Sequence, residues 1–215
     1  MDTLLELLHK LRDVKGLVAW GGYFGLTAII FAETGLFVGF FLPGDSLLVT
    51  AGLLASQAGF GLNTWLLAGI LTGASIVGNM VGYFVGRFSG PLLFKREESL
   101  LFKPHYLRQA HEFYEKHGGK TVIIARFMPI VRTFVPIVAG AAGMDYGRYT
   151  MYNAVGGVAW IWSMIFTGFF LGRYIPGIDR HIEKVIIVVI ALSLMPGVYH
   201  WWQARRRAKA EASTH

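Results

Sequence analysis

Residues 121–143 read Thr-Val-Ile-Ile-Ala-Arg-Phe-Met-Pro-Ile-Val-Arg-Thr-Phe-Val-Pro-Ile-Val-Ala-Gly-Ala-Ala-Gly, an apolar run that two prolines and two arginines interrupt. Because Pro129 and Pro136 break the run, neither arm reaches the ~20 residues that a helix needs to cross a bilayer. Non-helical backbone at membrane depth is tolerated only where protein or a water-filled cavity covers it. The stretch therefore predicts a re-entrant hairpin in a helical membrane protein.

Charge is distributed very unevenly along the 215 residues. Residues 16–86 contain only Glu33 and Asp45, and residues 185–204 contain no charged side chain. The chain is 15% charged and 54% hydrophobic, whereas a soluble domain has about 25% charged residues. Since it contains no cysteine, thiolate chemistry, cysteine-ligated zinc and iron–sulfur clusters are excluded. Long uncharged runs bordered by charges are typical of membrane segments.

These patterns predict one all-α polytopic membrane domain over residues 1–215. Its expected segments are an amphipathic N-terminal helix (1–15), a first broken hairpin (17–57), a transmembrane helix (64–87), a cytoplasmic amphipathic segment (88–120), a second re-entrant hairpin (121–144), two transmembrane helices (149–172 and 185–203) and a tail (205–215). Lysine and arginine concentrate in the segment that follows the first transmembrane helix and in the tail. The positive-inside rule therefore places both, and with them the C-terminus, in the cytoplasm.

The two halves of the chain repeat one pattern. Glu33 and Arg126 each precede a proline by ten residues, and Gly-Tyr-Phe-Val-Gly-Arg at 82–87 resembles Gly-Phe-Phe-Leu-Gly-Arg at 168–173. Corresponding broken segments in two halves indicate a transporter with its binding site at the repeat interface. We expect the repeats to be inverted, because a single helix, 64–87, is predicted to cross between the hairpins.

Four ionisable side chains lie inside the broken segments: Glu33, Asp45, Arg126 and Arg132. Each costs about 2.5–3.5 kcal/mol at the bilayer centre, so they are expected to face protein rather than lipid. The acids lie in one half and the arginines in the other, which favours pairing across the interface. Two ion pairs that only hold the hairpins together are one interpretation. Because desolvation offsets the attraction within buried pairs, a functional task is the alternative that we favour.

The charge types indicate what that task is. Arginine offers planar donors that suit a phosphate group, which makes Arg126 and Arg132 the predicted substrate-binding residues. Carboxylates inside a membrane mark proton paths, so Glu33 and Asp45 are the predicted proton-coupling residues. The expected substrate is an anionic, phosphate-bearing amphiphile that moves with or against protons. The residues expected to keep the hairpin tips non-helical are Pro43, Gly44, Pro129 and Pro136.

No enzyme, metal site or cofactor is expected. The broken segments and the helices that follow them, 16–86 and 121–172, contain no histidine for a membrane phosphatase. Only Asp45 lies deep where an aspartyl protease needs two aspartates, and the chain has no Gly-x-Ser-x-Gly motif. The net charge of +7 indicates anchoring beside apolar spans rather than binding of nucleic acid. A structural factor whose hairpins deform the bilayer stays an alternative.

Three further expectations concern side chains outside this set. Asn79 is expected to serve helix packing, and Asp145 with Arg148 to cap the helix that follows them. The tryptophans expected in lipid-facing and interfacial belts are Trp160, Trp162, Trp201 and Trp202.

Several stretches resemble the signatures of the DedA membrane-protein family. Phe-Ala-Glu-Thr-Gly at 31–35 and Phe-Leu-Pro-Gly-Asp-Ser-Leu-Leu at 41–48 resemble its first signature. Tyr-Glu-Lys-His-Gly-Gly-Lys-Thr at 114–121 and the arginine- and proline-containing run at 125–140 resemble its second. The resemblance implies a multi-pass protein of the bacterial inner membrane with paired re-entrant hairpins, related to eukaryotic lipid scramblases.

The resemblance also has functional implications. It implies proton-dependent membrane homeostasis and flipping of the undecaprenyl-phosphate carrier lipid, with the two acids and two arginines above as the essential residues. Relatives often have Asp where this chain has Asn79, so a proton path through that position differs here. The expected function is therefore a proton-coupled secondary transporter of a phosphate-bearing lipid. An energy-independent phospholipid scramblase and a non-transporting assembly factor are the alternatives. The expected partners are membrane lipids and protons, and a homo-oligomer stays open.

Overall fold

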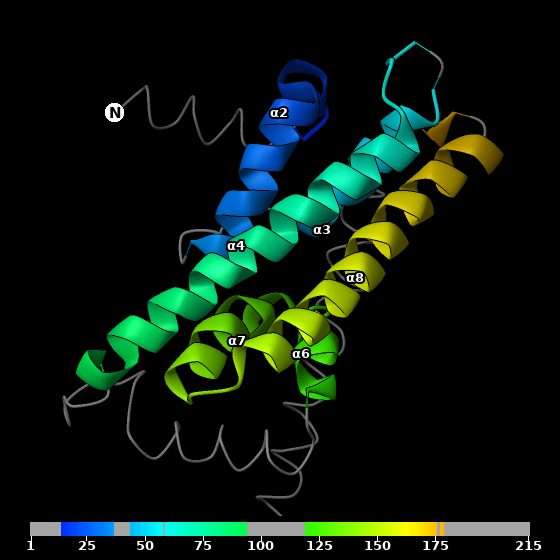
Figure 1. The fold of residues 1–215 in the computed structure, drawn as a ribbon. Helices are drawn as coiled ribbons and strands as arrows, with labels where there is room; N and C mark the ends of the chain where they lie inside the picture. The colour runs from blue at the N-terminus through cyan, green and yellow to red at the C-terminus, as the bar shows by residue number, and fades with distance from the viewer. Residues whose placement is uncertain (1–13, 37–43, 58, 94–118, 176, 179–215) are drawn as a thin grey trace, which may run out of the picture.

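The computed structural model describes residues 14–36, 44–57, 59–93, 119–175 and 177–178, which form helices and contain no strand (Figure 1). The helices are α2 (Val14–Gly35), α3 (Gly44–Ala55), α4 (Thr64–Leu93), α6 (Lys120–Ala125), α7 (Pro129–Ala141) and α8 (Tyr146–Tyr174). The predicted all-α fold is thus confirmed for this part of the chain. The N-terminal helix before residue 14, most of the cytoplasmic segment, the last transmembrane helix and the tail lie outside the described residues.

Two helices are long and apolar enough to cross a membrane, at Thr64–Ser89 and Tyr146–Tyr174. Each begins at a capping side chain. Asn63 Oδ1 accepts from the backbone N–H of Trp65 (3.0 Å), and Asp145 Oδ1 accepts from that of Arg148 (2.9 Å), which confirms the predicted cap. The two helices predicted for these regions are therefore present, although α4 continues to Leu93, beyond the expected end at residue 87.

The remaining helices are short and separated by breaks. Between α6 and α7 the chain turns at residues 126–128, and Met128 is extended (φ −112°, ψ 105°) immediately before Pro129, the first residue of α7. A proline disfavours helical backbone in the residue before it and fits the first helical position. The local sequence thus explains this break, while the re-entrant character of the segment stays a prediction about its place in a bilayer.

Three of the four predicted tip residues lie in helices, and the first of them, Pro129, begins α7 rather than a non-helical tip. Pro136 lies inside α7, so its prediction as a non-helical tip is wrong. Its ring removes only the bond to the carbonyl of Arg132, and neighbouring helices compensate for such a loss in membrane proteins. Gly44 is the first residue of α3 rather than part of an open tip. Pro43 lies outside the described residues.

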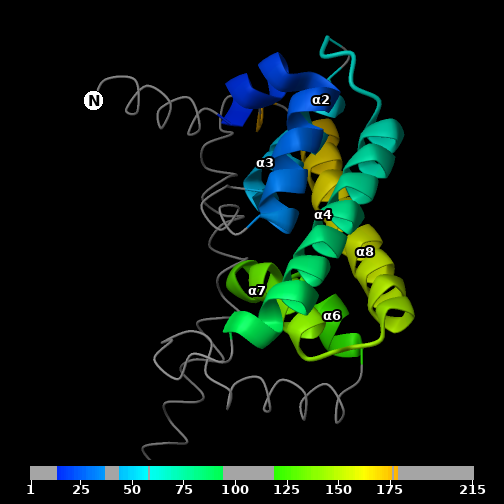
Figure 2. The same cartoon turned by 60° about the vertical axis from the view of Figure 1, so that its left-hand side comes forward.

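Each half of the chain has a short helix that packs against the long helix of the other half. In this exchange α3 lies along α8, and α7 lies along α4 (Figures 1 and 2). Glycines occupy both crossings. A Cβ atom added to Gly52 or Gly168 would overlap backbone of the opposite helix in the α3–α8 pair, and one added to Gly140 or Gly86 would do so in the α7–α4 pair. Small residues allow helices in membranes to approach this closely.

The reciprocal packing gives a structural meaning to the two similar hexapeptides. Gly82 and Gly86 of the first face α7, and Gly168 and Gly172 of the second face α3. Each hexapeptide therefore forms the contact between one long helix and the short helix of the other half. The proposed repeat with inverted halves is compatible with this exchange and stays a prediction.

Substitution of these glycines tests the packing. We expect Gly168→Ala to lower the melting temperature of the purified protein in detergent, because the added methyl group overlaps the Val49 carbonyl in α3. The matched control is Gly69→Ala in α4, where an added Cβ meets nothing within 4 Å. There the higher helix propensity of alanine should leave the melting temperature unchanged or raise it. Equal effects of the two substitutions would contradict close packing of α3 and α8.

Candidate functional site

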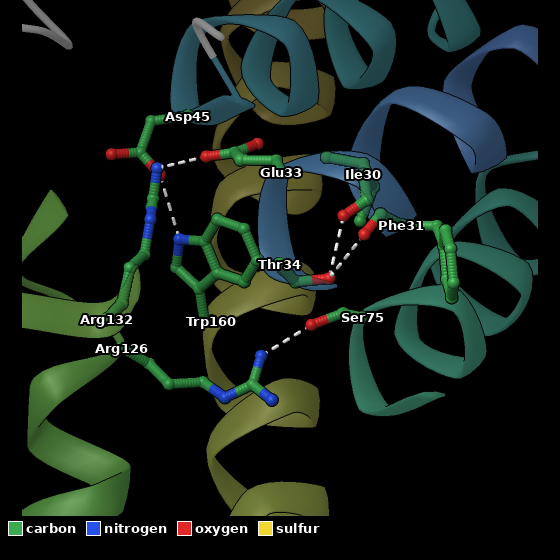
Figure 3. Close-up of polar contacts among 9 residues, drawn as sticks. All are labelled: Ile30, Phe31, Glu33, Thr34, Asp45, Ser75, Arg126, Arg132 and Trp160. Atoms are coloured by element: carbon green, nitrogen blue, oxygen red, sulfur yellow. Dashed lines mark hydrogen bonds and ion pairs between the residues drawn. The ribbon is translucent and has the colours of Figure 1, made fainter. Parts of the chain in front are cut away.

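Arg132 lies in the first turn of α7 and pairs with both acids of the first half (Figure 3). Its Nη1 donates to Asp45 Oδ1 (2.5 Å), and its Nη2 pairs with Glu33 Oε1. The three side chains are at most 10% exposed. They come from α7, from the first turn of α3 and from the end of α2. The predicted pairing across the two halves is therefore confirmed for this arginine.

Gly44 explains how the two acids come so close to each other. A Cβ atom at this position would overlap the Glu33 carboxylate, so glycine lets α3 begin against that side chain without displacing it. Asp45 follows in the first turn of α3, where the positive end of the helix dipole favours its carboxylate. Within the part of the chain that the structure describes, Glu33 Oε2 is buried without a hydrogen-bond partner.

Trp160 of α8 completes this cluster. Its indole is fully buried, and its Nε1 donates to Asp45 Oδ1 (2.9 Å). Arg132 Cζ lies 4.6 Å from the centroid of the same ring, within the range of a cation–π interaction. The prediction that Trp160 lies in a lipid-facing belt is therefore wrong. The signal in the sequence that could have placed Trp160 inside the protein is its helical spacing from Asn153 and Gly156. All three lie on the buried face of α8.

Arg126 has a different environment. It is 3% exposed, and its guanidinium donates to Ser75 Oγ (2.5 Å) and to Asn153 Oδ1. No carboxylate pairs with it among the described residues, where its Nε also lacks a partner. The expected pairing with an acid is therefore wrong for Arg126. The reason is its position at the C-cap of α6, from which it extends toward Ser75 of α4 and Asn153 of α8, while Arg132 of α7 lies against both acids (Figure 3).

The helices around Arg126 supply space and neutral acceptors. Gly156 in α8 leaves room for its side chain, since an added Cβ would lie 3.3 Å from Arg126 Cδ. Asn79 is buried beside it and donates to Asn153 Oδ1 (3.0 Å). With its amide turned the other way, Asn79 donates to the Thr34 carbonyl (2.9 Å) and accepts from Arg126 Nη2 (2.8 Å). Asn79 therefore belongs to the polar site, a role beyond the predicted helix packing.

The four buried charges sum to zero but are divided unequally. With both acids ionised, the cluster of Glu33, Asp45 and Arg132 carries one excess negative charge, and the surroundings of Arg126 carry one positive charge. Such an arrangement can accept an anion at one guanidinium and a proton at one carboxylate. Among the residues that the structure places, no group of three or more histidine, aspartate or glutamate side chains could hold a metal ion.

The long apolar helices and the charges buried between the two halves define the class of a helical membrane protein with an internal polar site. Residues 42–170 match the VTT domain. Together with the relatives below, this match shows that the chain belongs to the VTT/DedA family of membrane proteins. Membership of this family is consistent with the role of a membrane transporter or flippase.

Three relatives illustrate the similarity. The chain is 44% identical over 212 residues to the protein DedA of Escherichia coli K12, with 99% of this chain and 96% of that protein aligned. It is 40% identical over 220 residues to an uncharacterized membrane protein of Mycobacterium leprae, covering 100% and 97%. The inner membrane protein YqjA of Escherichia coli K12 is 36% identical over 151 residues, covering 70% and 68%. No solved structure matches the chain.

The shared guanidinium predicts an order of stability among variants. Arg132→Gln leaves two buried carboxylates facing each other, and loss of one partner from a buried pair costs about 3–5 kcal/mol. Glu33→Gln or Asp45→Asn leaves Arg132 paired with the remaining acid, so we expect each to cost less. Thermal unfolding in detergent measures the order. A melting temperature of Arg132→Gln at or above those of the two acid variants would contradict a shared ion pair.

Proposed function

We propose that this protein is a proton-coupled secondary transporter that moves a phosphate-bearing lipid across the bacterial inner membrane. The observation that carries the proposal is Arg126, a buried arginine whose described contacts are all with neutral side chains. We propose binding and movement of the lipid, without an enzymatic step, as the role of the site. The resemblance to the DedA family makes undecaprenyl phosphate the favoured substrate.

Arg126 is suited to the phosphate group. A guanidinium without a counter-ion in a low-dielectric site is costly, and an anionic ligand would remove that cost. Phosphate oxygens accept two parallel hydrogen bonds from arginine and would replace the neutral acceptors Ser75 and Asn153. Only the head group needs this polar site, so the isoprenoid tail of the lipid would stay in the bilayer.

Charge balance connects phosphate binding to proton uptake. The four ionised side chains are neutral together, so a phosphate with one negative charge leaves one negative charge in excess. A proton on Glu33 or Asp45 restores neutrality and removes one partner from Arg132. The freed guanidinium can then bind the same phosphate. The exchange packing of α3 with α8 and α7 with α4 supports alternating access, because it gives each short helix a partner in the other half.

Reconstituted lipid flipping tests this function. Proteoliposomes that contain a fluorescent polyprenyl phosphate should show protein-dependent flipping that an imposed pH gradient accelerates. We expect Arg126→Gln, Arg132→Ala and Glu33→Gln to lower the rate at least about tenfold, because each removes a charge-assisted contact. Arg148→Gln, at an exposed arginine, is the matched control.

The outcomes separate the alternatives. Unchanged flipping in Arg132→Ala or Glu33→Gln would exclude the mechanism. Flipping of many phospholipids without any effect of the gradient would identify an energy-independent scramblase. Absence of flipping by the wild-type protein would favour an assembly factor.

Asn79→Asp tests whether Arg126 has to be free to bind phosphate. The substitution places a carboxylate beside Arg126 at the position of the amide. An ionised Asp at this position competes with phosphate, whereas a protonated one does not. We therefore expect the variant to retain transport at acidic pH and to lose it at alkaline pH, relative to the wild type. An identical pH profile of the two proteins would contradict phosphate binding by Arg126.

A further inference from the structure

Trp160 contacts both members of one ion pair with two different parts of its side chain. The indole N–H donates to Asp45 Oδ1, the oxygen that also accepts from Arg132 Nη1. The face of the indole ring lies against the Arg132 guanidinium (Figure 3). The first contact is stronger with an ionised carboxylate than with a protonated one, whereas the second needs only the permanent charge of the guanidinium, so the first alone depends on the ionisation of Asp45.

A buried tryptophan in a helical core usually needs only some acceptor for its N–H group. Trp160 also packs in an apolar cluster with residues of α2, α3 and α4, which anchors the ring independently of the ion pair. The ring is therefore a fixed reference, while the carboxylate and the guanidinium can change partners around it. Trp160 also lies seven residues after Asn153, which binds Arg126, and this spacing places both on one face of α8.

We propose that Trp160 is a positioning residue that couples the ionisation of Asp45 to the place of the Arg132 guanidinium. While Asp45 is ionised, the indole N–H holds Oδ1 in the position that Arg132 needs. Once Asp45 takes up a proton, the ring face still holds the guanidinium near the site without neutralising its charge. This inference rests on the proposed function. It names Trp160 as the residue that sets the pH range over which Arg132 is released from Asp45.

The groups around Asp45 limit what else could set that range. Among the residues described by the structure, the charged side chains that face it are Glu33 from α2 and Arg132 from α7. Arg126 at the end of α6 is directed instead to α4 and α8. From α8 the contact is Trp160, which does not titrate. Removal of the indole N–H therefore alters the surroundings of Asp45 without adding or removing a charge.

Two substitutions separate the two contacts. Trp160→Phe retains an aromatic face for Arg132 but has no N–H group, and Trp160→Leu removes both. The matched control is Trp162→Phe in the same helix, since Trp162 packs edge-on against Trp65 (centroids 5.7 Å apart) rather than against the ion pair.

The first measurement is tryptophan emission of the full chain in lipid nanodiscs as a function of pH, without any substrate. We expect the wild type and Trp162→Phe to show a sigmoidal change in emission, and Trp160→Phe and Asp45→Asn to lack it. Persistence of the change in Asp45→Asn would overturn the proposal. That variant retains Trp160, so the result holds even where Trp160→Phe does not fold.

The second measurement is flipping of the fluorescent polyprenyl phosphate by the same variants. Loss of a hydrogen bond to the carboxylate makes the ionised form less favourable, so the pH of half-maximal transport should rise by about one unit in Trp160→Phe. The maximal rate should fall further in Trp160→Leu, which loses both contacts, than in Trp160→Phe, which loses one. An unchanged pH profile in Trp160→Phe would overturn the coupling. Absence of flipping by the wild type would refute the proposed function, and the emission measurement would still decide the contact.

Discussion

The sharing of one guanidinium by two acids is the constraint on which the rest of the structure depends. Arg132 from the second half of the chain satisfies Glu33 and Asp45 from the first, and all three are almost removed from solvent. Three charges in such a site are tolerated only while each has its partners in place. Two features meet this requirement: α3 begins against Glu33 at Gly44, and the first turn of α7 carries Arg132 to both acids.

The glycine-lined crossings allow this charge cluster to form. They bring α3 against α8 and α7 against α4, so each short helix is held by the long helix of the other half. Close backbone contact supplies van der Waals packing where lipid offers no hydrophobic gain from association. The same contacts place α8 beside both arginines, since Asn153 binds Arg126 and Trp160 binds the Arg132 cluster. One helix therefore connects the two charged centres.

The two arginines differ in what surrounds them, and this difference makes the distribution of charge in the site asymmetric. Arg132 pairs with two carboxylates, while Arg126 contacts only neutral acceptors among the described residues. The proposed link between phosphate binding and proton uptake rests on this difference in charge between the two environments. Two separate, symmetric ion pairs would not have this asymmetry of charge.

From the amino-acid order alone one obtains the apolar helices, the cap at Asp145, the break before Pro129 and the four buried charges, because these follow from hydropathy, capping and proline geometry within a few neighbouring residues. The partners of each charge could not be obtained that way. Residues 33 and 132 meet only because four helices cross, and the same crossings direct Arg126 away from both acids. Trp160 enters the site for the same reason. A tryptophan side chain suits a lipid-facing surface or a protein core equally well, and only the packing of α3 on α8 places its N–H group against Asp45.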